Sequence, residues 1–372
     1  MQLLMASTSY PRDRADWRGV FIRHLVDAFA HADDVQLHLL APPGEVPSNV
    51  EIVANAAESA WLARLMLAGG ISHLLRGGEL ASLLAPLALL RLLSRAYRRE
   101  RGVDAYHINW LQCALPLPDN GIPAVIGVLG NDLKLLRLPL MRALLRRIMR
   151  RRRVAICPNS EWMRAPLQAA FGDLAEVVPI SFGIDARWYT IARTPQRPAR
   201  WLAVTRLTKD KLGPLFEWSA PLFNDARARE LHLFGPMQES ITVPDWVHYH
   251  GPADADMLAS EWFPSASGLV TLSKHAEGRP QIMLEAMAAG LPIIASRMPA
   301  HNGVVRDGVT GLLCDTREAF ARAITRTEDP HTNADFGAAA RAAARVEYGT
   351  WDDCAARYLV VHRRLQTRKA NA

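Results

Sequence analysis

Short apolar runs alternate with amphipathic stretches along the chain, and this alternation restricts the fold more than any other feature. Residues 3–8 read LLMAST and predict a buried strand, residues 20–30 carry apolar side chains at helical spacing, and residues 35–42 predict another strand. The same pattern resumes at residues 201–207 and continues through further short apolar runs bounded by turn residues. Strands that alternate with helices in this way predict parallel sheets covered by helices, an α/β fold.

The chain of 372 residues is long enough for two such domains. Periodicity is lost in a proline- and arginine-rich stretch at 189–201, where we place the linker. The predicted domains are therefore residues 1–190 and 191–345, followed by residues 346–372, which read as a capped amphipathic helix. Within the first domain, a leucine-, alanine- and arginine-rich segment at about 58–100 predicts a helical insertion.

Two glutamates in the second half, Glu277 and Glu285, stand eight residues apart. The first lies beside a Gly-Arg-Pro turn, and the second lies in an Ala/Met/Gly-rich stretch that predicts a helix. A turn ahead of a helix presents backbone N–H groups at the positive end of the helix dipole, which favours a phosphate or a sugar hydroxyl. Because one carboxylate can accept two O–H bonds, the pair suits a ligand with a diol near each end. Taken alone, the spacing favours two solvent-exposed glutamates, because such pairs also occur by chance.

Two cations, Arg206 and Lys211, stand close to the end of the strand predicted at 201–207. Strand ends in open α/β sheets face the ligand crevice. Arginine forks onto phosphate and lysine acts as a point charge, so the two side chains could neutralise a pyrophosphate. The alternative is a basic surface loop.

Taken in order along the chain, the predicted strands, the cation pair and the glutamate pair of the second half resemble the C-terminal domain of family 4 glycosyltransferases of the GT-B fold. The resemblance is strongest at residues 269–315, which hold the family's E-x7-E pair. Three further segments resemble the family's N-terminal loop and first helix, the segment ahead of its linker and its last helix: residues 9–29, 177–189 and 348–358. The resemblance implies two Rossmann-like domains that face a cleft, with a C-terminal helix that crosses back to the first domain.

The resemblance also implies a retaining transferase that uses a UDP- or GDP-sugar and needs neither a metal nor another cofactor. Arg206 and Lys211 would hold the diphosphate and stabilise the leaving group. Glu285 would bind the ribose diol, and Glu277 would contact the hydroxyls of the donor sugar. Glu277, Arg206 and Lys211 are thus the predicted catalytic residues. Backbone groups would complete the donor site at Gly19, Gly278, Arg279 and Gln281.

Three departures from the family pattern affect this reading. The N-terminal loop has Arg18-Gly19 where the family often has two glycines, and Arg279 stands where an aromatic residue is common. The family's His-Gly-x-Asp element is replaced by a Leu-Gly-Asn-Asp sequence at 129–132, which lacks the histidine. The residues expected to supply its contact on the acceptor side are Asn131, Asp132 and His107. His107 could equally be a core histidine.

Residues 138–158 are the most basic stretch in a chain of formal net charge +7. A helix with leucines on one face and arginines around the rest, at 138–153, can lie on an anionic membrane surface. It can equally pack on a sheet with a solvated basic face. Interleaved aromatic residues are lacking, which argues against nucleic acid. The longest apolar-type run, residues 80–90, is about half a membrane span. We therefore expect a cytoplasmic protein that is peripheral on the inner face of the cytoplasmic membrane.

The leading interpretation is a glycosyltransferase that moves a sugar to a glycan or lipid-linked acceptor in bacterial cell-surface polysaccharide synthesis. One alternative is a nucleotide-sugar epimerase of the same fold, which would turn over donor without acceptor. Another is a non-catalytic scaffold, suggested by the missing histidine. Asp254 and Asp256 have the D-x-D spacing of metal-dependent transferases, but we expect Asp254 to cap the following helix instead.

Overall fold

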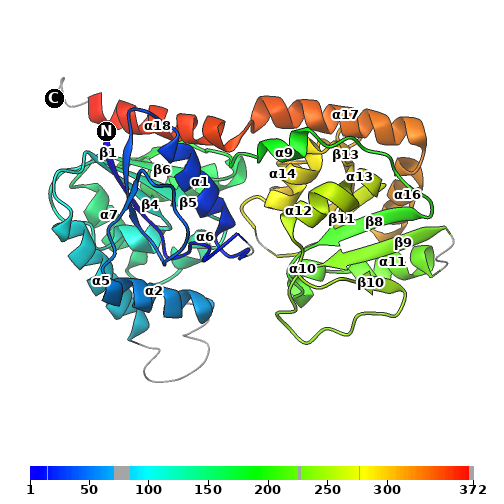
Figure 1. Cartoon of the computed structure of the whole chain (residues 1–372), viewed down its shortest axis with the longest axis horizontal. Helices are drawn as coiled ribbons and strands as arrows, with labels where there is room; N and C mark the ends of the chain where they lie inside the picture. Colours follow the sequence, from blue (N-terminus) through cyan, green and yellow to red (C-terminus); the bar gives the residue numbers. More distant parts are fainter. Residues whose placement is uncertain (15, 71–83, 225–227, 276, 368–372) are drawn as a thin grey trace. The chain divides into compact units, whose positions relative to one another are not determined.

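A computed structural model shows two compact units (Figure 1). The first unit runs from Met1 to Phe182 and takes up the chain again at Trp351, and the second runs from Gly183 to Thr350. The structure describes residues 1–14, 16–70, 84–224, 228–275 and 277–367.

The described residues of the first unit form a seven-stranded parallel sheet in the order β3-β2-β1-β4-β5-β6-β7. Its strands are β1 (Gln2–Ala6), β2 (Gln36–Leu40), β3 (Val50–Ile52), β4 (Ala105–Asn109), β5 (Ala124–Val128), β6 (Val154–Pro158) and β7 (Glu176–Val177). Its helices are α1 (Val20–Ala30), α2 (Ala56–Leu67), α5 (Ala85–Arg99), α6 (Asp132–Leu135), α7 (Met141–Met149), α8 (Arg164–Phe171) and α18 (Trp351–Thr367), with short 3-10 helices at Leu111–Ala114 and Glu161–Met163.

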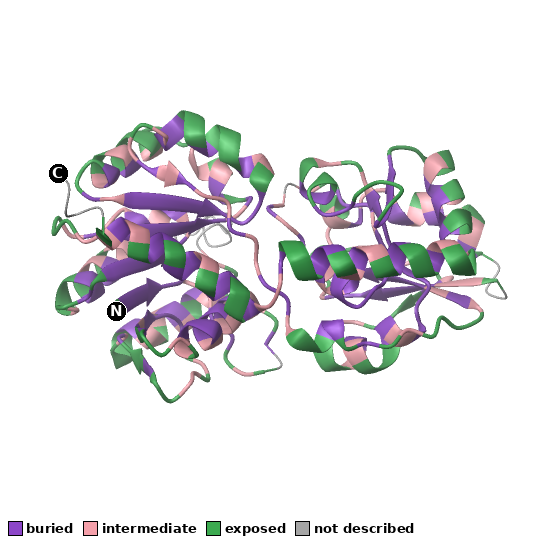
Figure 2. Cartoon of the chain, turned by 90° about the horizontal axis from the view of Figure 1, so that it is seen from above, coloured by how far each residue is buried: buried purple, intermediate pink, exposed green. Residues whose placement is uncertain are grey.

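Both faces of this sheet are covered, which explains why its strands read as continuous apolar runs. Leu4 and Ala6 of β1 join the core beneath α2, α5, α7 and α8. Leu3 and Met5, which point the other way, join the core beneath α1 and α18. The inner strands of both units are accordingly buried between partly exposed helices (Figure 2).

The second unit is built in the same way on a six-stranded parallel sheet among its described residues, in the order β10-β9-β8-β11-β12-β13. Its strands are β8 (Ala199–Val204), β9 (Arg229–Phe234), β10 (Val247–Tyr249), β11 (Gly268–Thr271), β12 (Ile293–Ser296) and β13 (Gly311–Cys314). Its helices are α9 (Ala186–Tyr189), α10 (Lys209–Leu212), α11 (Leu215–Phe223), α12 (Ala255–Met257), α13 (Phe263–Ser265), α14 (Gln281–Ala288), α15 (Pro299–Asn302), α16 (Arg317–Thr327) and α17 (Pro330–Glu347), with a π-helical turn at Leu258–Trp262.

The predicted α/β class with two parallel sheets is confirmed, and so is the return of the C-terminal helix to the first unit. In α18 the apolar positions expected to pack inward are all buried, namely Trp351, Ala355, Tyr358, Leu359 and Val361, and this helix packs against α1. Cys354 and Tyr358 of α18 share one core cluster with Leu25 of α1. The helix therefore completes one face of the first sheet.

The units divide a few residues away from the predicted boundaries at 190 and 345. Phe182 stacks on Phe21 of the first unit, at 5.2 Å between ring centroids. Two residues later Ile184 pairs with Thr350 in the second unit. The chain therefore crosses at 182/183 and again at 350/351.

The proline- and arginine-rich stretch that we took for the linker belongs to the second unit. The guanidinium group of Arg193 donates to the carbonyls of Gly290 and Ala266, which fastens the stretch to that unit. Loss of hydrophobic periodicity marks an irregular segment here, and not a free linker.

The leucine- and arginine-rich segment at 58–100 contributes α5 and most of α2, and residues 71–83 of this prediction lie outside the described residues. A capping box begins α2, because Asn55 and Glu58 each accept the other's backbone N–H. Within the described part of the chain, every helix is too short or too polar to cross a membrane.

Candidate functional site

Lys211 and Glu277 form an ion pair in the second unit, although 66 positions separate them in sequence. Lys211 lies on α10, directly after β8, and its backbone N–H is capped by the hydroxyl of Thr208. Glu277 lies in the loop between β11 and α14. Because β8 and β11 are neighbours in the sheet, both loops leave the same edge. The two side chains are 11% and 16% exposed, so a small ligand can reach them.

The ion pair is held in a partly desolvated place. Burial lowers the pKa of Lys211, while the charge of Glu277 acts in the opposite direction. The positive charge of Arg206, at the end of β8, also lowers the pKa of Lys211. The Arg206 guanidinium makes one long contact, 3.5 Å, with the side-chain oxygen of Gln238. A second cation, Arg206, is therefore close enough to the Lys211–Glu277 pair to act on it, which favours an anionic ligand at this place.

Glu285 lies on the fifth residue of α14, inside the helix that the sequence predicted. Burial and the negative charge of Asp185 together raise the pKa of this carboxyl to about 7. The charge of Arg187 acts in the opposite direction. Asp185 and Arg187 belong to the start of α9 and were not predicted as site residues.

We expect the affinity for a nucleotide-diphosphate sugar to depend on pH through Glu285. An ionised carboxylate accepts hydrogen bonds from two hydroxyl groups, and a protonated carboxyl group is a weaker acceptor of these bonds. With a pKa of about 7, Glu285 is mostly ionised at pH 8 and mostly protonated at pH 6, so affinity should fall about tenfold between them. Calorimetric titration with UDP-glucose and GDP-mannose, whose diphosphates do not titrate in this range, measures the change.

The matched variant for this titration is Glu285→Gln, which cannot ionise. It should bind the nucleotide sugar more weakly, with an affinity that no longer changes between pH 6 and pH 8. A wild-type affinity that is constant over this range would contradict the assignment of Glu285.

The Gly-Arg-Pro turn precedes α14 as predicted, with Pro280 in the N-cap position. The guanidinium of Arg279 lies 4.9 Å from the ring centroid of Tyr348, so this side chain is directed to an aromatic partner and not to solvent. The side chain of Gln281 donates to the carbonyl of Gly183 at 2.9 Å. Gly278 is buried. A donor contact from these residues would therefore come from the backbone.

His301 is a residue of this site that the sequence reasoning missed. Its imidazole is fully buried and Nδ1 lies 2.9 Å from the carbonyl of Ser296. The Ser296 hydroxyl donates to the carbonyl of Ser273, whose own hydroxyl lies 3.5 Å from Glu277. Burial lowers the pKa of His301, and the charges of Glu277 and Lys211 also act on it. The available signal was its place five residues after the short apolar run PIIAS at 292–296, which follows the glutamate segment.

His107 was predicted as an acceptor-side residue, and this assignment is wrong. The residue lies in β4 with no exposed surface. Its Nδ1 is 3.2 Å from Nε2 of His362, and its ring packs edge-on against Phe29 and Tyr358. Burial lowers the pKa of His107 to about 3, so it is a neutral core residue.

Asp132 has a structural task. Its carboxylate accepts the backbone N–H groups of Leu111, at 3.1 Å, and Leu129, at 2.7 Å. The side chain is 2% exposed, and burial raises its pKa to about 7. Asp132 therefore fixes the loop after β5, while its neighbour Asn131 is exposed and stays a candidate for the acceptor side.

Gly19 occupies the N-cap position of α1 with φ of 73°. A Cβ at this position would lie 2.4 Å from the hydroxyl oxygen of Ser9, so a side chain does not fit. The neighbouring Arg18 is directed away, with Nε 2.9 Å from the buried carboxylate of Asp16. The loop thus presents backbone at Gly19, as a phosphate contact requires.

The D-x-D sequence is a helix start. Asp254 accepts the backbone N–H of Asp256 at 2.8 Å and caps α12, as predicted. Across the described ranges, no group of three or more His, Cys, Asp or Glu side chains is arranged to hold a metal ion.

The basic helix is shorter than predicted, and most of its arginines bond to the protein. Arg146 pairs with Asp173, and Arg151 pairs with Asp119. Arg152 is buried against the carbonyl of Ile122. Arg142 and Arg153 donate to the carbonyls of Ala169 and Gln366. These side chains help to hold α7 on the first unit.

The second unit has recognisable relatives. Residues 201–329 match the family model described as glycosyl transferases group 1. D-inositol 3-phosphate glycosyltransferase of Streptomyces griseus is 38% identical over 116 residues, which cover 30% of this chain and 24% of that protein. The protein of the same name from Arthrobacter sp. is 37% identical over 101 residues, covering 26% and 24%. The chain thus matches about a quarter of the length of these relatives.

Solved structures match over the whole chain. Sucrose-phosphate synthase from Thermosynechococcus elongatus has a TM-score of 0.72 at 17% identity and covers 99% of this chain and 100% of its own. HepE from Anabaena, in complex with UDP and glucose, has a TM-score of 0.63 at 16% identity, with 98% and 100% covered. The chain has the fold of GT-B glycosyltransferases. The predicted GT-B fold is confirmed by these structures, and residues 201–329 match a glycosyltransferase family model that is not specific for family 4.

Proposed function

We propose that this protein is a retaining glycosyltransferase that moves a sugar from a UDP- or GDP-sugar to a glycan or lipid-linked acceptor. The observation that carries the proposal is the Lys211–Glu277 ion pair, with Arg206 beside it and Glu285 on the next helix. A non-catalytic scaffold has no need for a partly desolvated cation and carboxylate at the end of a parallel strand.

In this proposal the diphosphate replaces Glu277 as the counter-ion of Lys211. Phosphate oxygens then bind Lys211 and Arg206, whose charges stabilise the nucleotide as it leaves. Glu277, released from the ion pair, accepts hydroxyl groups of the donor sugar and holds the ring in place. Glu285 accepts the ribose hydroxyls. His301 and the two serines keep the Glu277 loop in register.

Two findings support a nucleotide-sugar donor. HepE, which shares the fold, has been solved in complex with UDP-glucose. The family match at 201–329 covers Arg206, Lys211 and both glutamates. A cell-surface acceptor is supported more generally, because a lipopolysaccharide outer core galactosyltransferase shares the fold with a TM-score of 0.62 at 14% identity.

The test of the function is a turnover assay with UDP- and GDP-sugars, with and without a lipid extract or glycan as acceptor. A glycosyltransferase releases free nucleotide much faster when its acceptor is present, and the sugar appears on the acceptor with the anomeric configuration of the donor. Conversion of the donor sugar to its epimer without acceptor would instead establish the epimerase alternative.

We also propose that the first unit binds the inner face of the cytoplasmic membrane through one edge of α7. Leu140 is 75% exposed, and Leu138 and Leu144 are about half exposed. Arg147 and Arg150, exposed on the same segment, have no bonded partner within the described residues and can meet anionic head groups. This surface is smaller than the sequence suggested, because the other arginines of the segment bond to the protein.

Replacing Leu140 and Leu144 with aspartate should therefore weaken binding to vesicles of anionic phospholipid at least about tenfold, since two apolar anchors are lost and two negative charges are added. Co-sedimentation with vesicles measures the affinity. The matched control is Val346→Asp on α17, where the replaced side chain is 88% exposed. Equal binding by both variants would show that the α7 edge does not contact the membrane.

A further inference from the structure

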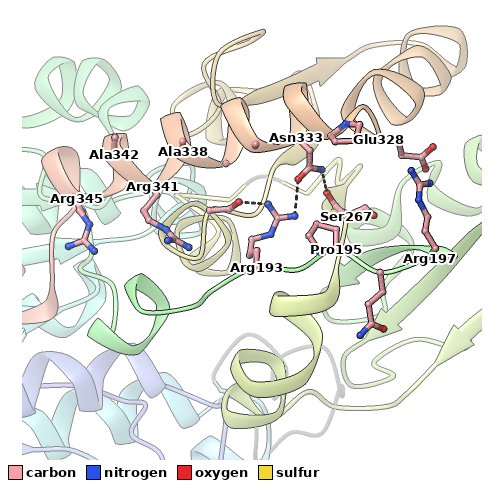
Figure 3. Close-up of a pocket in the computed structure, with 15 residues that line it drawn as sticks. Arg193, Pro195, Arg197, Ser267, Glu328, Asn333, Ala338, Arg341, Ala342 and Arg345 are labelled. Atoms are coloured by element: carbon pink, nitrogen blue, oxygen red, sulfur yellow. Dashed lines mark hydrogen bonds between the residues drawn. The ribbon is translucent and has the colours of Figure 1, made fainter.

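A groove of about 700 Å³ lies in the second unit, between the irregular segment 193–197 and α17 (Figure 3). Its lining contains none of the four residues proposed to bind the donor. Four arginines line it instead: Arg193, Arg197, Arg341 and Arg345. The groove is therefore a second concentration of positive charge, separate from the one at Lys211.

The two innermost arginines are held by neutral groups. Arg193 donates to the carbonyl of Gly290 at 2.6 Å and to the side-chain oxygen of Asn333 at 3.0 Å. Arg341 donates to the carbonyls of Ala288, at 3.0 Å, and Ile191, at 2.6 Å. Carbonyl groups fix these guanidinium groups in position, but they carry no net charge to neutralise them.

The acidic side chain in the lining is Glu328, and it is already engaged. Its carboxylate accepts two hydrogen bonds from Arg229, at 2.7 and 2.8 Å, and one from the indole of Trp201. Arg345 lies over the ring of Tyr189, at 4.7 Å from the centroid. Arg197 is exposed and has no bonded partner among the residues described. The groove therefore has uncompensated positive charge.

The arginines affect one another electrostatically. Burial and the positive charge of Arg341 together lower the pKa of Arg193 to about 10. Burial also lowers the pKa of Arg341, with a further contribution from Arg345. Such neighbouring charges disfavour one another in a partly desolvated place, and an anion between them removes this cost.

We propose that this groove binds a small phosphate-bearing molecule, a nucleotide or a sugar phosphate, independently of the donor site. Guanidinium groups recognise phosphate through paired N–H donors. A volume of about 700 Å³ lies within the range of small-molecule sites. The remaining wall of α17 is a flat surface of small residues, against which the organic part of the ligand can lie: Ala334, Gly337, Ala338 and Ala342.

The place of the groove connects it to the donor site through one helix. Arg341 donates to the carbonyl of Ala288, the last residue of α14, the helix that carries Glu285, and Arg193 donates to the carbonyl of Gly290, two residues beyond its end. At Gly337, α17 approaches so closely that a Cβ would lie 2.3 Å from the carbonyl oxygen of Gly290. A phosphate in the groove would therefore contact arginines that also bond to the C-terminal end of α14. The donor site lies toward the other end of the same helix.

The test uses calorimetric titration of inorganic pyrophosphate into the full chain with Arg206→Ala and Lys211→Ala, which removes the proposed donor contacts. In this background, the additional changes Arg197→Gln and Arg345→Gln should weaken binding at least about tenfold, because two charge-assisted contacts are lost. The matched control is Arg317→Gln, an exposed arginine of the same unit outside the groove. It should leave the affinity unchanged.

Two results would overturn the proposal. One is the absence of pyrophosphate binding once Arg206 and Lys211 are replaced, and the other is equal affinity in the groove variant and the Arg317 control. Parallel titrations with glucose 1-phosphate and with UDP and ADP distinguish the ligand classes. A compound that binds more tightly than pyrophosphate, and loses this advantage in the groove variant, identifies whether a sugar or a nucleoside is recognised with the phosphate.

Discussion

Replacing Glu277 with glutamine should lower kcat for sugar transfer by about 10²–10³-fold and change nucleotide affinity only a few-fold. Glutamine keeps the size of the side chain and one oxygen acceptor, but it loses the negative charge that accepts sugar hydroxyls and balances Lys211. Truncation to alanine should abolish transfer as well. It also leaves a partly buried lysine without its partner, so glutamine is the sharper probe of the chemistry.

Single-turnover rates with saturating donor measure this effect, and calorimetry measures nucleotide affinity in the same variant. The matched control is Glu217→Gln on α11, an exposed glutamate of the same unit. Normal turnover in Glu277→Gln would remove the residue from the proposed site. A large loss of nucleotide affinity with unchanged kcat would assign Glu277 to nucleotide binding and not to the sugar.

Replacing Lys211 with glutamine should reduce kcat/KM by about 10³-fold, with losses in both affinity and kcat. The ammonium group is expected to bind the diphosphate in the ground state and to stabilise the additional charge as the nucleotide departs, and the second contribution appears in kcat. The contact that Arg206 makes with Gln238 is exposed, whereas the Lys211–Glu277 pair is partly buried, so Arg206→Gln should act mainly on KM.

Lys209, on the same short helix as Lys211 but exposed, provides the matched control. Lys209→Gln should retain kcat and KM within about twofold, as expected of a surface charge in salt. If Lys209→Gln and Lys211→Gln have similar kinetics, the effect of Lys211 is one of general surface charge, and the assignment to the leaving group fails.

Much of this arrangement follows from sequence because parallel strands impose strong local patterns. The apolar runs at β1 and β8 are continuous because both sheet faces are buried, and polar residues directly after a strand must lie at its carboxyl end. For this reason Arg206 and Lys211 could be placed at the end of a strand, and the resemblance to family 4 glycosyltransferases assigned Lys211 and Glu277 to one site. The sequence does not contain the contact between them, which depends on the order of strands in the sheet.

Other features depend on tertiary packing that local pattern does not encode. A histidine in a strand can face a core or a ligand, and His107 is in the core because α18, more than 240 positions later, supplies His362 as its partner. The arginines around α7 looked like a membrane surface, yet Arg146 and Arg151 pair with aspartates from other segments. His301 gave no motif, and only the packing of β12 beside β11 brings it to the Glu277 loop.

The domain boundary illustrates the same limit. Proline and arginine interrupt hydrophobic periodicity at 189–201, which suggested a linker. In the structure Arg193 donates to backbone carbonyls of the second unit, so the irregular segment packs on that unit and is part of its fold. Hydrogen bonds from long side chains to distant carbonyls leave no periodic trace, so the arginine groove was also invisible in the sequence.

The central claim is that the second unit binds a nucleotide diphosphate through Arg206 and Lys211, and calorimetric titration tests it most directly. UDP, GDP, ADP and their common sugar conjugates are titrated into the wild-type chain and into the Arg206→Ala/Lys211→Ala variant. We expect one nucleotide to bind selectively and the double variant to lose at least about 100-fold in affinity for it, consistent with two charge-assisted contacts. Absence of binding to every nucleotide, or equal affinity in the double variant, would contradict it.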